Sequence, residues 1–130
     1  MEWNELSKKE KQSFSEADVC RISITPSIHS ANWDSIKQIR EQYYFTDGNV
    51  EVNGNKTKRG KAKKADYVLY HKPNIPLAIV EAKDNTHSIG DGMQQALDYA
   101  EILDVPFAYS SNGDAFIAVS YTHLRAHETD

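Results

Sequence analysis

A carboxylate and an ammonium group stand two residues apart at the end of an otherwise apolar segment, "PLAIVEAK". Residues i and i+2 of a β-strand point to the same face, so Glu81 and Lys83 should project together. Residues 77–80 are all apolar, which is typical of a central strand covered on both faces. Burying charge there is costly unless the groups are paired or bound to something. Glu81 and Lys83 are therefore candidates for a binding or catalytic site.

A second acid, Asp66, is predicted to meet this strand end. "KPNIP" predicts a hairpin turn through residues 72–76, which would place Asp66 within a few ångströms of Glu81 or Lys83. Two converging carboxylates repel each other, and a divalent cation removes that conflict. Mg²⁺ typically accepts one or two carboxylates plus phosphate oxygens, and the Ala82 carbonyl could add an oxygen ligand. The simpler alternative is an ion pair at a strand end, with Asp66 as a turn residue.

The order of the predicted helices and strands that must position these groups indicates a mixed α/β domain around one sheet. The first half of the chain predicts a helix near 15–24, a break at Pro26, a short helical piece to about 31, and a helix start at Asp34. "EQYYF" then has strand character, and the Asp-Gly pair in "TDGNV" predicts a hairpin to "VEV".

The second half of the chain predicts strands on either side of one helix. "ADYVLYH" and "LAIVEAK" form the hairpin, and "VPFAYSS" and "AFIAV" are the last two strands. Between the two pairs, apolar residues recur at helical spacing from about Gly90–Gly92 to Asp104. We expect one domain, with residues 1–12 as an N-terminal extension and residues 13–118 as the folded unit.

Positive charge is concentrated in one segment, residues 56–64, within a chain of net charge −4. We predict that this segment is a loop that contacts phosphates, because clustered Lys and Arg release counterions from nucleic acid. The alternative is a solvated loop. The candidate DNA contacts are Lys56, Lys58, Arg59, Lys61, Lys63 and Lys64.

The composition of the chain excludes several other classes of protein. No stretch approaches the roughly 18 apolar residues of a membrane span, and the N-terminus lacks the apolar core of a signal peptide. The single cysteine, Cys20, excludes a disulfide framework and a multi-thiolate zinc site. We therefore expect a cytoplasmic protein without a membrane partner.

The last twelve residues, "VSYTHLRAHETD" (119–130), resemble a translated sequencing-library adapter. We expect them to be a non-native, disordered tail on a fragment of a larger protein. His123 and His127 stand at i, i+4, yet the tail resemblance argues against interpreting them as metal ligands.

The pattern "ADYVLYHKPNIPLAIVEAKDN…GMQQALDYAEILDVPFAYSSNGDAF" resembles the nuclease domain of type I restriction enzyme R subunits, which has the PD-(D/E)xK fold, a mixed sheet flanked by helices. The resemblance covers nearly all of residues 13–118. Ala65 stands where the superfamily's name has proline, a common variation. No G-x-x-x-x-G-K-[ST] phosphate loop is present, so ATP binding and translocation would reside in the missing part of such a subunit.

The resemblance implies a role for each matching residue. Asp66 and Glu81 would be metal-binding acids and Lys83 the catalytic lysine. Gln95 and Tyr99 match the family's Q-x-x-x-Y element, one helical turn apart. The residue that matches the family's additional helix acid is Glu16, which could also be simply an acid in the first turn of a helix.

The resemblance implies an Mg²⁺-dependent endonuclease domain acting on double-stranded DNA without reading sequence. Its partners would be the methyltransferase and specificity subunits of a restriction complex, and we expect the isolated fragment to be weak or silent. Two other hypotheses are a non-catalytic DNA-binding or subunit-docking module, and a structural domain in which E-x-K arises by chance.

Overall fold

A five-stranded mixed sheet forms the centre of the molecule, in a computed structural model that describes residues 2–46, 49–52, 56–59 and 62–120. The sheet order is β1-β4-β5-β6-β7, in which β5 and β6 are parallel and the other neighbours are antiparallel. Its strands are β1 (Ile39–Phe45), β4 (Lys63–Lys72), β5 (Ile75–Ala82), β6 (Phe107–Ser111) and β7 (Phe116–Ser120). The predicted mixed α/β fold is confirmed.

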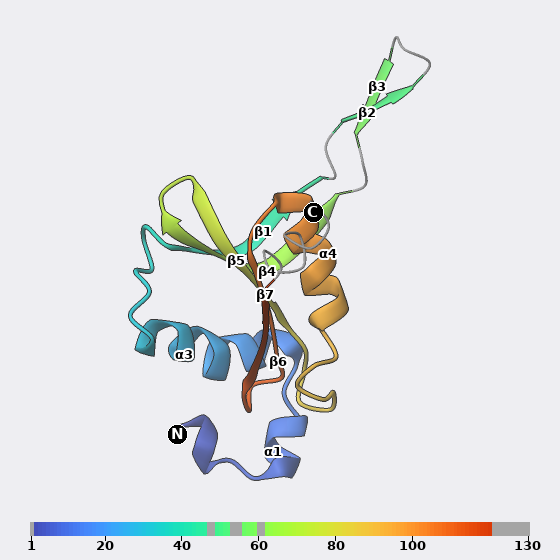
Figure 1. Cartoon of the computed structure of the whole chain (residues 1–130). Helices are drawn as coiled ribbons and strands as arrows, with labels where there is room; N and C mark the ends of the chain where they lie inside the picture. Colours follow the sequence, from blue (N-terminus) through green and yellow to red (C-terminus); the bar gives the residue numbers. More distant parts are fainter. Residues whose placement is uncertain (1, 47–48, 53–55, 60–61, 121–130) are drawn as a thin grey trace.

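Helices cover both faces of this sheet, as Figure 1 shows. On one face lie α2 (Glu16–Val19), η2 (Cys20–Ile24) and α3 (Thr25–Ser30), and on the other lies α4 (Met93–Leu103). The predicted core helix is confirmed as α4, which ends where Asp104 adopts a left-handed conformation (φ 55°). Among the described residues, no helix has the length and apolar character that crossing a membrane requires.

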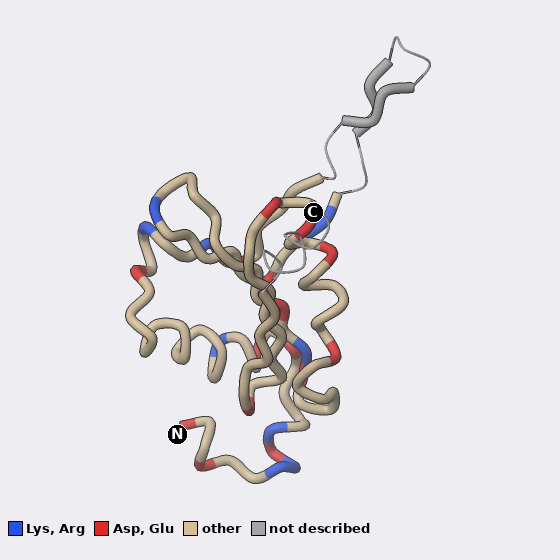
Figure 2. The backbone as a smooth tube through the Cα atoms, in the orientation of Figure 1, with Lys and Arg blue, Asp and Glu red and all other residues tan. Residues whose placement is uncertain are grey.

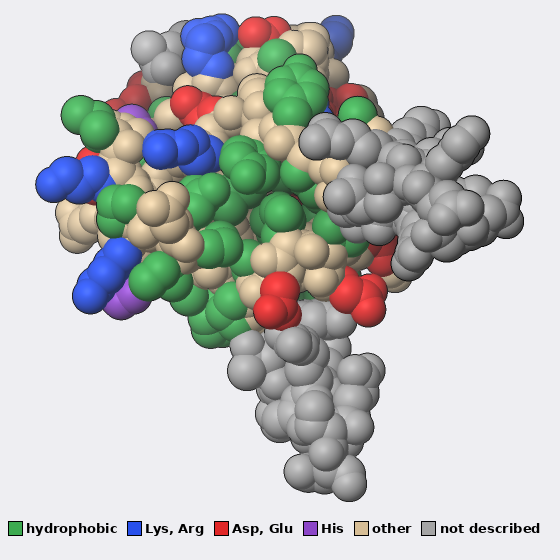
Figure 3. Space-filling model, turned by 90° about the horizontal axis from the view of Figure 1, so that it is seen from above, with side chains coloured by type: hydrophobic (Ala, Val, Ile, Leu, Met, Phe, Trp, Pro, Cys, Tyr) green, Lys and Arg blue, Asp and Glu red, His purple; other side chains and the backbone are tan. Residues whose placement is uncertain are grey.

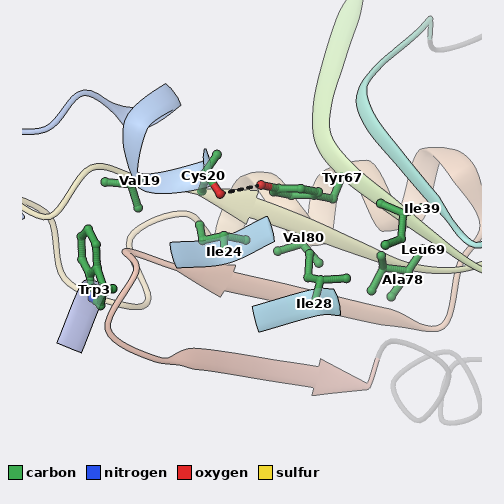
Figure 4. Close-up of a cluster of buried hydrophobic side chains, with 11 residues drawn as sticks. Trp3, Val19, Cys20, Ile24, Ile28, Ile39, Tyr67, Leu69, Ala78 and Val80 are labelled. Atoms are coloured by element: carbon green, nitrogen blue, oxygen red, sulfur yellow. Dashed lines mark hydrogen bonds between the residues drawn. The ribbon is translucent and has the colours of Figure 1, made fainter. Parts of the chain in front are cut away.

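Two clusters of buried side chains hold the layers together. On the α3 face, Val19, Ile24 and Ile28 pack onto side chains of β4 and β5 (Figure 4). Tyr67 is buried there, and its hydroxyl donates to the Cys20 carbonyl (3.4 Å). On the other face, small residues of α4, such as Ala96, let the helix approach the strands closely. The catalytic candidates of β4 and β5 therefore stand on a rigid support.

The N-terminal residues are packed into the fold. They form η1 (Trp3–Glu5) and α1 (Lys8–Gln12), which Ser7 caps by accepting from the Glu10 N–H (3.1 Å). The Trp3 ring is 6% exposed and joins the core of the α3 face. Its indole N–H donates to Asp114 at the turn between β6 and β7 (3.1 Å). The extension predicted for residues 1–12 therefore contributes a core side chain.

The predicted break at Pro26 is wrong. Helical structure continues from Glu16 to Ser30 because η2 is a wider, π-helical turn, in which the Thr25 N–H bonds to the Cys20 carbonyl. Pro26 then stands within the first two positions of α3, directly after this wider turn. The helix predicted to start at Asp34 is a single turn, and β1 begins at Ile39.

The predicted hairpin between β1 and the strand after it is also wrong. β1 pairs with β4, whereas β2 (Asn49–Val52) pairs with β3 (Lys56–Arg59) in a separate two-stranded sheet that projects from the body (Figure 1). β1 joins the main sheet because Tyr43 and Phe45 pack against the core of the α4 face. Phe45 meets Tyr99 edge-on, with 5.0 Å between the ring centroids.

The end of the chain is described only to Ser120. Val119 and Ser120 are the last residues of β7 and pair with Ala108 and Phe107. These two residues of the predicted tail are therefore ordered. Residues 121–130, including His123 and His127, lie outside the described residues.

The described surface has distinct apolar and charged regions. Hydrophobic side chains gather over the middle of the face seen in Figure 3, with Lys and Arg toward its edge. Acidic positions recur along α4 (Figure 2). Outside the site, large hydrophobics remain exposed at Ile36, Tyr44, Ile75, Phe116 and Ile117.

Candidate active site

Asp66 and Glu81 meet where β4 and β5 separate. The last paired residues of the two strands are Tyr67 and Val80. Beyond them, side chains replace the ladder: the Asp66 N–H donates to Glu81 Oε2 (2.9 Å), and the Ala82 N–H donates to Asp66 Oδ2 (2.8 Å). Each acid is therefore anchored on the other acid's strand. The predicted approach of Asp66 to Glu81 is confirmed.

Helix α4 supplies the third contact. The Gln95 amide donates to the second oxygen of Glu81, Oε1, over 2.9 Å, and also to the Tyr99 hydroxyl over 3.0 Å. Gln95 and Tyr99 are one turn apart on the helix, so they share a face. Of the two residues predicted as a Q-x-x-x-Y element, Gln95 thus contacts the Glu81 carboxylate and Tyr99 contacts Gln95, and their roles in chemistry stay predictions.

These groups line a cavity of about 130 Å³ at the end of the sheet. Glu16 enters it from α2, and the two lysines Lys64 and Lys83 enter it from the ends of β4 and β5. The lining residues are Glu16, Lys64, Asp66, Glu81, Ala82, Lys83, Gly92 and Gln95. Every residue that the resemblance implied for chemistry therefore lies in or beside one small cavity.

Burial makes this cavity electrostatically strained. Asp66 and Glu81 are 5% and 3% exposed. Burial, reinforced by the charges of Asp66 and Glu16, raises the pKa of Glu81 to about 8, against the opposing hydrogen bonds from the Asp66 N–H and Gln95. Burial also raises the pKa of Asp66, and burial followed by the charge of Asp66 raises the pKa of Glu16. The site holds more negative charge than its surroundings stabilise.

The two lysines do not neutralise this charge by direct contact. Within the part of the chain that the structure describes, no ion pair joins Lys64 or Lys83 to an acid of the cavity. Lys83 is half-buried and its N–H bonds to the Ser111 carbonyl (2.9 Å), while the Lys64 side chain is exposed. Both ammonium groups are available for other partners.

The donor set fits a hard divalent cation. No group of three His, Cys, Asp or Glu side chains in the described ranges could hold a metal alone. Mg²⁺ needs only one or two carboxylates, since waters and phosphate oxygens complete its octahedron. Two buried carboxylates without an ion-paired cation meet that need, and a bound cation would favour their ionised forms. The residues that would hold it are Asp66 and Glu81, with Ala82 beside them.

Gly92, which lines the cavity, and Ser110, which contacts it, were not predicted as site residues. The Gly92 N–H, at the start of α4, donates to the Ser110 hydroxyl (3.0 Å), which donates to the Ile89 carbonyl (2.7 Å). A Cβ at Gly92 would stand 3.0 Å from that hydroxyl and 3.5 Å from the Glu81 Cβ. The missing side chain therefore lets the start of α4 lie close to Ser110, next to Glu81.

Gln42 was also not predicted. It is the one residue of β1 without a paired partner, at the position opposite Asp66, and its φ of 51° is in the left-handed region. Such a conformation is costly for a residue with a side chain and often occurs at functional sites. Its side chain is one of the groups that act against burial to lower the pKa of Asp66. Nothing in the local sequence distinguishes this glutamine from any other strand residue.

The basic segment is divided among several elements, which corrects the prediction of one loop. Lys56, Lys58 and Arg59 lie in β3, and Lys61 lies outside the described residues. The first two residues of β4 are Lys63 and Lys64. Among these basic residues, Lys64 lines the cavity.

Polar contacts hold the loop that follows Lys83. The Asn85 amide, 6% exposed, donates to the Asn112 carbonyl (2.9 Å) and to Asp114 (3.1 Å). Asp84 accepts from the N–H and hydroxyl of Thr86, so its carboxylate closes a turn. The loop is therefore held against the β6–β7 turn, and it leads to Gly92 at the cavity.

A larger hollow of about 900 Å³ lies on the α3 face. Its lining is mainly apolar and includes Ile28, Trp33, Leu69, Val80 and Phe116. No buried carboxylate lies among its lining residues. Size therefore does not identify the reactive cavity, whereas converging titratable groups do.

Three comparisons with known proteins agree on one family. The family model described as "Type I restriction enzyme R protein N terminus" matches residues 49–126. The "Type I restriction enzyme EcoAI endonuclease subunit" of Escherichia coli is 51% identical over 104 residues, which cover 80% of this chain and 13% of that protein. A solved fragment assigned as the HsdR subunit of a type I restriction enzyme from Vibrio vulnificus YJ016 is 47% identical, with a TM-score of 0.70 over 85% of this chain and 22% of that one.

Proposed function

The chain belongs to the family of type I restriction enzyme R protein N-terminal domains, and from that premise we propose that it is a metal-dependent DNA endonuclease domain. The single observation that carries this proposal is the pair of buried carboxylates, Asp66 and Glu81, anchored to each other's strands. The chain spans 13% of the length of its curated relative. Restriction by the whole subunit, ATP-driven translocation, and partners such as methyltransferase and specificity subunits are therefore part of the proposal.

The acids and Gln95 would create the site for the cation. Asp66 and Glu81 would hold Mg²⁺, which supplies charge stabilisation and an activated water at the phosphodiester. Gln95 holds Glu81 Oε1, so the acid's orientation is fixed before substrate arrives. Tyr99 in turn accepts from Gln95 and limits the rotation of that amide. Such preorganisation is what a phosphoryl-transfer site requires.

Lys83 would act at the attacking water or at the charge that develops on the phosphate. It follows β5 directly, and its backbone is tied to Ser111, so the start of the side chain is fixed beside Glu81. Glu16 lines the same cavity from α2, and burial, followed by the charge of Asp66, raises its pKa. Glu16 would bind a water of the cation or accept a proton from it.

DNA would be bound without base recognition. The basic residues of segment 56–64, of which Lys56, Lys58 and Arg59 belong to β3 and Lys63 and Lys64 to β4, would follow the phosphate backbone. Contacts of this kind position a duplex without reading its sequence. We expect the protein to work in the cytoplasm, where foreign DNA arrives.

Metal binding gives the first test. Calorimetric titration of Mg²⁺ into the wild-type chain should show binding that Glu81→Ala removes. Glu101→Ala, which removes an exposed acid of α4, is the matched control and should bind as the wild type does. Equal Mg²⁺ binding by wild type and Glu81→Ala would refute the site.

Plasmid nicking gives the second test and separates the two candidate functions. With Mg²⁺ or Mn²⁺, nicking that is lost in Lys83→Ala and kept in Lys72→Ala supports the endonuclease. The alternative, a DNA-binding or subunit-docking module, is favoured by the small share of the relative that this chain covers. That alternative predicts salt-sensitive binding of duplex DNA without nicking.

A further inference from the structure

Lys64 lies in the main sheet next to Lys63, and of the described basic residues of segment 56–64 it is the one that lines the cavity. It pairs with Tyr44 of β1 and stands two residues before Asp66 on β4. It lines the cavity together with both buried acids, whereas the hairpin residues Lys56 and Lys58 belong to another sheet. Its geometry is therefore that of a cavity residue.

The Lys64 charge acts on the cavity acids while making no ion pair with them. Burial raises the pKa of Asp66, and the groups that act in the opposite direction are, in order, the Ala82 N–H, Lys64, Lys83 and the Gln42 side chain. Lys64 also acts to lower the pKa of Glu16. The Lys64 side chain is exposed, whereas Lys83 is half-buried, so Lys64 stands at the solvent side of the cavity.

We propose that Lys64 is a substrate-binding residue, whose ammonium group holds the phosphodiester that enters the cavity. This inference rests on the proposed nuclease function and divides the work of the two lysines. Lys83, deeper beside the acids, would serve the reacting water. Lys64, at the mouth, would hold a phosphate oxygen through a charge-assisted hydrogen bond.

A second explanation is that Lys64 only offsets the charge of the acids. Both explanations predict tighter Mg²⁺ binding when Lys64 becomes neutral, because a positive charge near the acids repels the cation. They differ in the binding of a phosphodiester. A phosphate-binding Lys64 makes a direct contact, so its removal should weaken phosphodiester binding, whereas a lysine that only offsets the acids should leave that binding unchanged.

The test uses this chain and the dinucleotide dTpT, which has one phosphodiester and cannot span a long basic surface. Binding of dTpT in the presence of Ca²⁺ is followed by NMR shifts of the Ala65, Ala82 and Gly92 amides. Mg²⁺ binding is measured separately by calorimetry. The variants are Lys64→Gln, Lys64→Arg and the control Lys72→Gln, an exposed lysine at the other end of β4.

In Lys64→Gln, dTpT should bind about tenfold more weakly and Mg²⁺ about threefold more tightly. Lys64→Arg should keep dTpT binding within about threefold of the wild type, and Lys72→Gln should change neither. Unchanged dTpT binding in Lys64→Gln, no saturable shift in the wild type, or loss of dTpT and Mg²⁺ binding together would each overturn the inference. Failure of the proposed function is seen separately, as Mg²⁺ binding that Glu81→Ala leaves intact.

Discussion

Replacing Glu81 with glutamine should remove a large part of the pH dependence of this chain's stability between about pH 4.5 and 8. In the folded chain burial raises the pKa of Glu81 from 4.5 to about 8, with the charges of Asp66 and Glu16 acting in the same direction. In the unfolded chain the carboxyl is solvated and ionises near its ordinary value. Folding therefore keeps a proton that the unfolded chain releases.

The sign follows from the number of bound protons. Between pH 4.5 and 8 the folded state binds more protons through Glu81 than the unfolded state, so the free energy of unfolding falls as pH rises. Below this window both states are protonated, and above it both are ionised. The contribution of Glu81 is thus fully present at low pH and lost by about pH 8.

The size of the effect can be bounded. One such group costs about 1.4 kcal/mol per pH unit, so the loss across the window is at most about 5 kcal/mol. That is comparable with the whole stability of a small domain. Asp66 and Glu16 also have raised pKa values and act in the same direction. They remain in the variant, as do the surface acids with lowered pKa values, so the difference between the two proteins isolates Glu81.

The assay is urea unfolding followed by fluorescence of Trp3 and Trp33, at intervals from pH 5 to 9 without divalent cations. Glu101→Gln, an exposed acid on α4, is the control and should run parallel to the wild type. Glutamine at position 81 cannot accept at both oxygens, so a constant offset from the wild type is expected. A wild-type minus Glu81→Gln difference that does not change between pH 5 and 8 would refute the electrostatic description of the site.

Three further results are expected. The apparent affinity for Mg²⁺ should rise with pH, by up to tenfold per unit below about pH 8, because cation and proton compete for the same carboxylate; calorimetry at several pH values measures this. Gly92→Ala should destabilise the chain by about 1–2 kcal/mol and weaken Mg²⁺ binding, because the added Cβ meets the buried Ser110 hydroxyl at 3.0 Å. The control Gly90→Ala should be tolerated, because the nearest neighbour of its Cβ is a side chain at 3.4 Å. Urea unfolding measures the stability of both variants, and calorimetry measures their Mg²⁺ binding. Gly113→Ala should cost about 2–4 kcal/mol in urea unfolding, because φ is 97° and its Cβ would stand 2.6 Å from the Trp3 ring.

Local sequence patterns predicted those parts of the site whose residues are connected by one hairpin or one helix. A hairpin with a turn near residues 72–76 necessarily brings Asp66 to Glu81, and the helical spacing of α4 brings Gln95 and Tyr99 to one face. The alternation of a strand likewise indicated that Glu81 and Lys83 would reach the same region. These relations connect near neighbours, so they could be predicted from residue types and spacing.

Long-range choices could not be predicted in the same way. By local rules the Asp-Gly pair between β1 and β2 predicts a hairpin, yet β1 pairs with β4 because Tyr43 and Phe45 pack against the core of the α4 face. Pro26 is a helix breaker by local rules, and the π-turn before it becomes acceptable only as part of a buried layer. Trp3 enters the core through a contact with Asp114, at the far end of the described chain.

By itself, the sequence determined which chemistry was available: two acids, a lysine and a glutamine at spacings that a hairpin and a helix convert into proximity. Only the tertiary structure decided that Asp66 and Glu81 are buried and anchored by each other's backbone, that Gln42 stands unpaired opposite Asp66, and that Lys64 belongs to the cavity. The physical reason is that burial and charge balance arise from atoms distant in the chain. No local pattern encodes the desolvation that raises the pKa of Glu81.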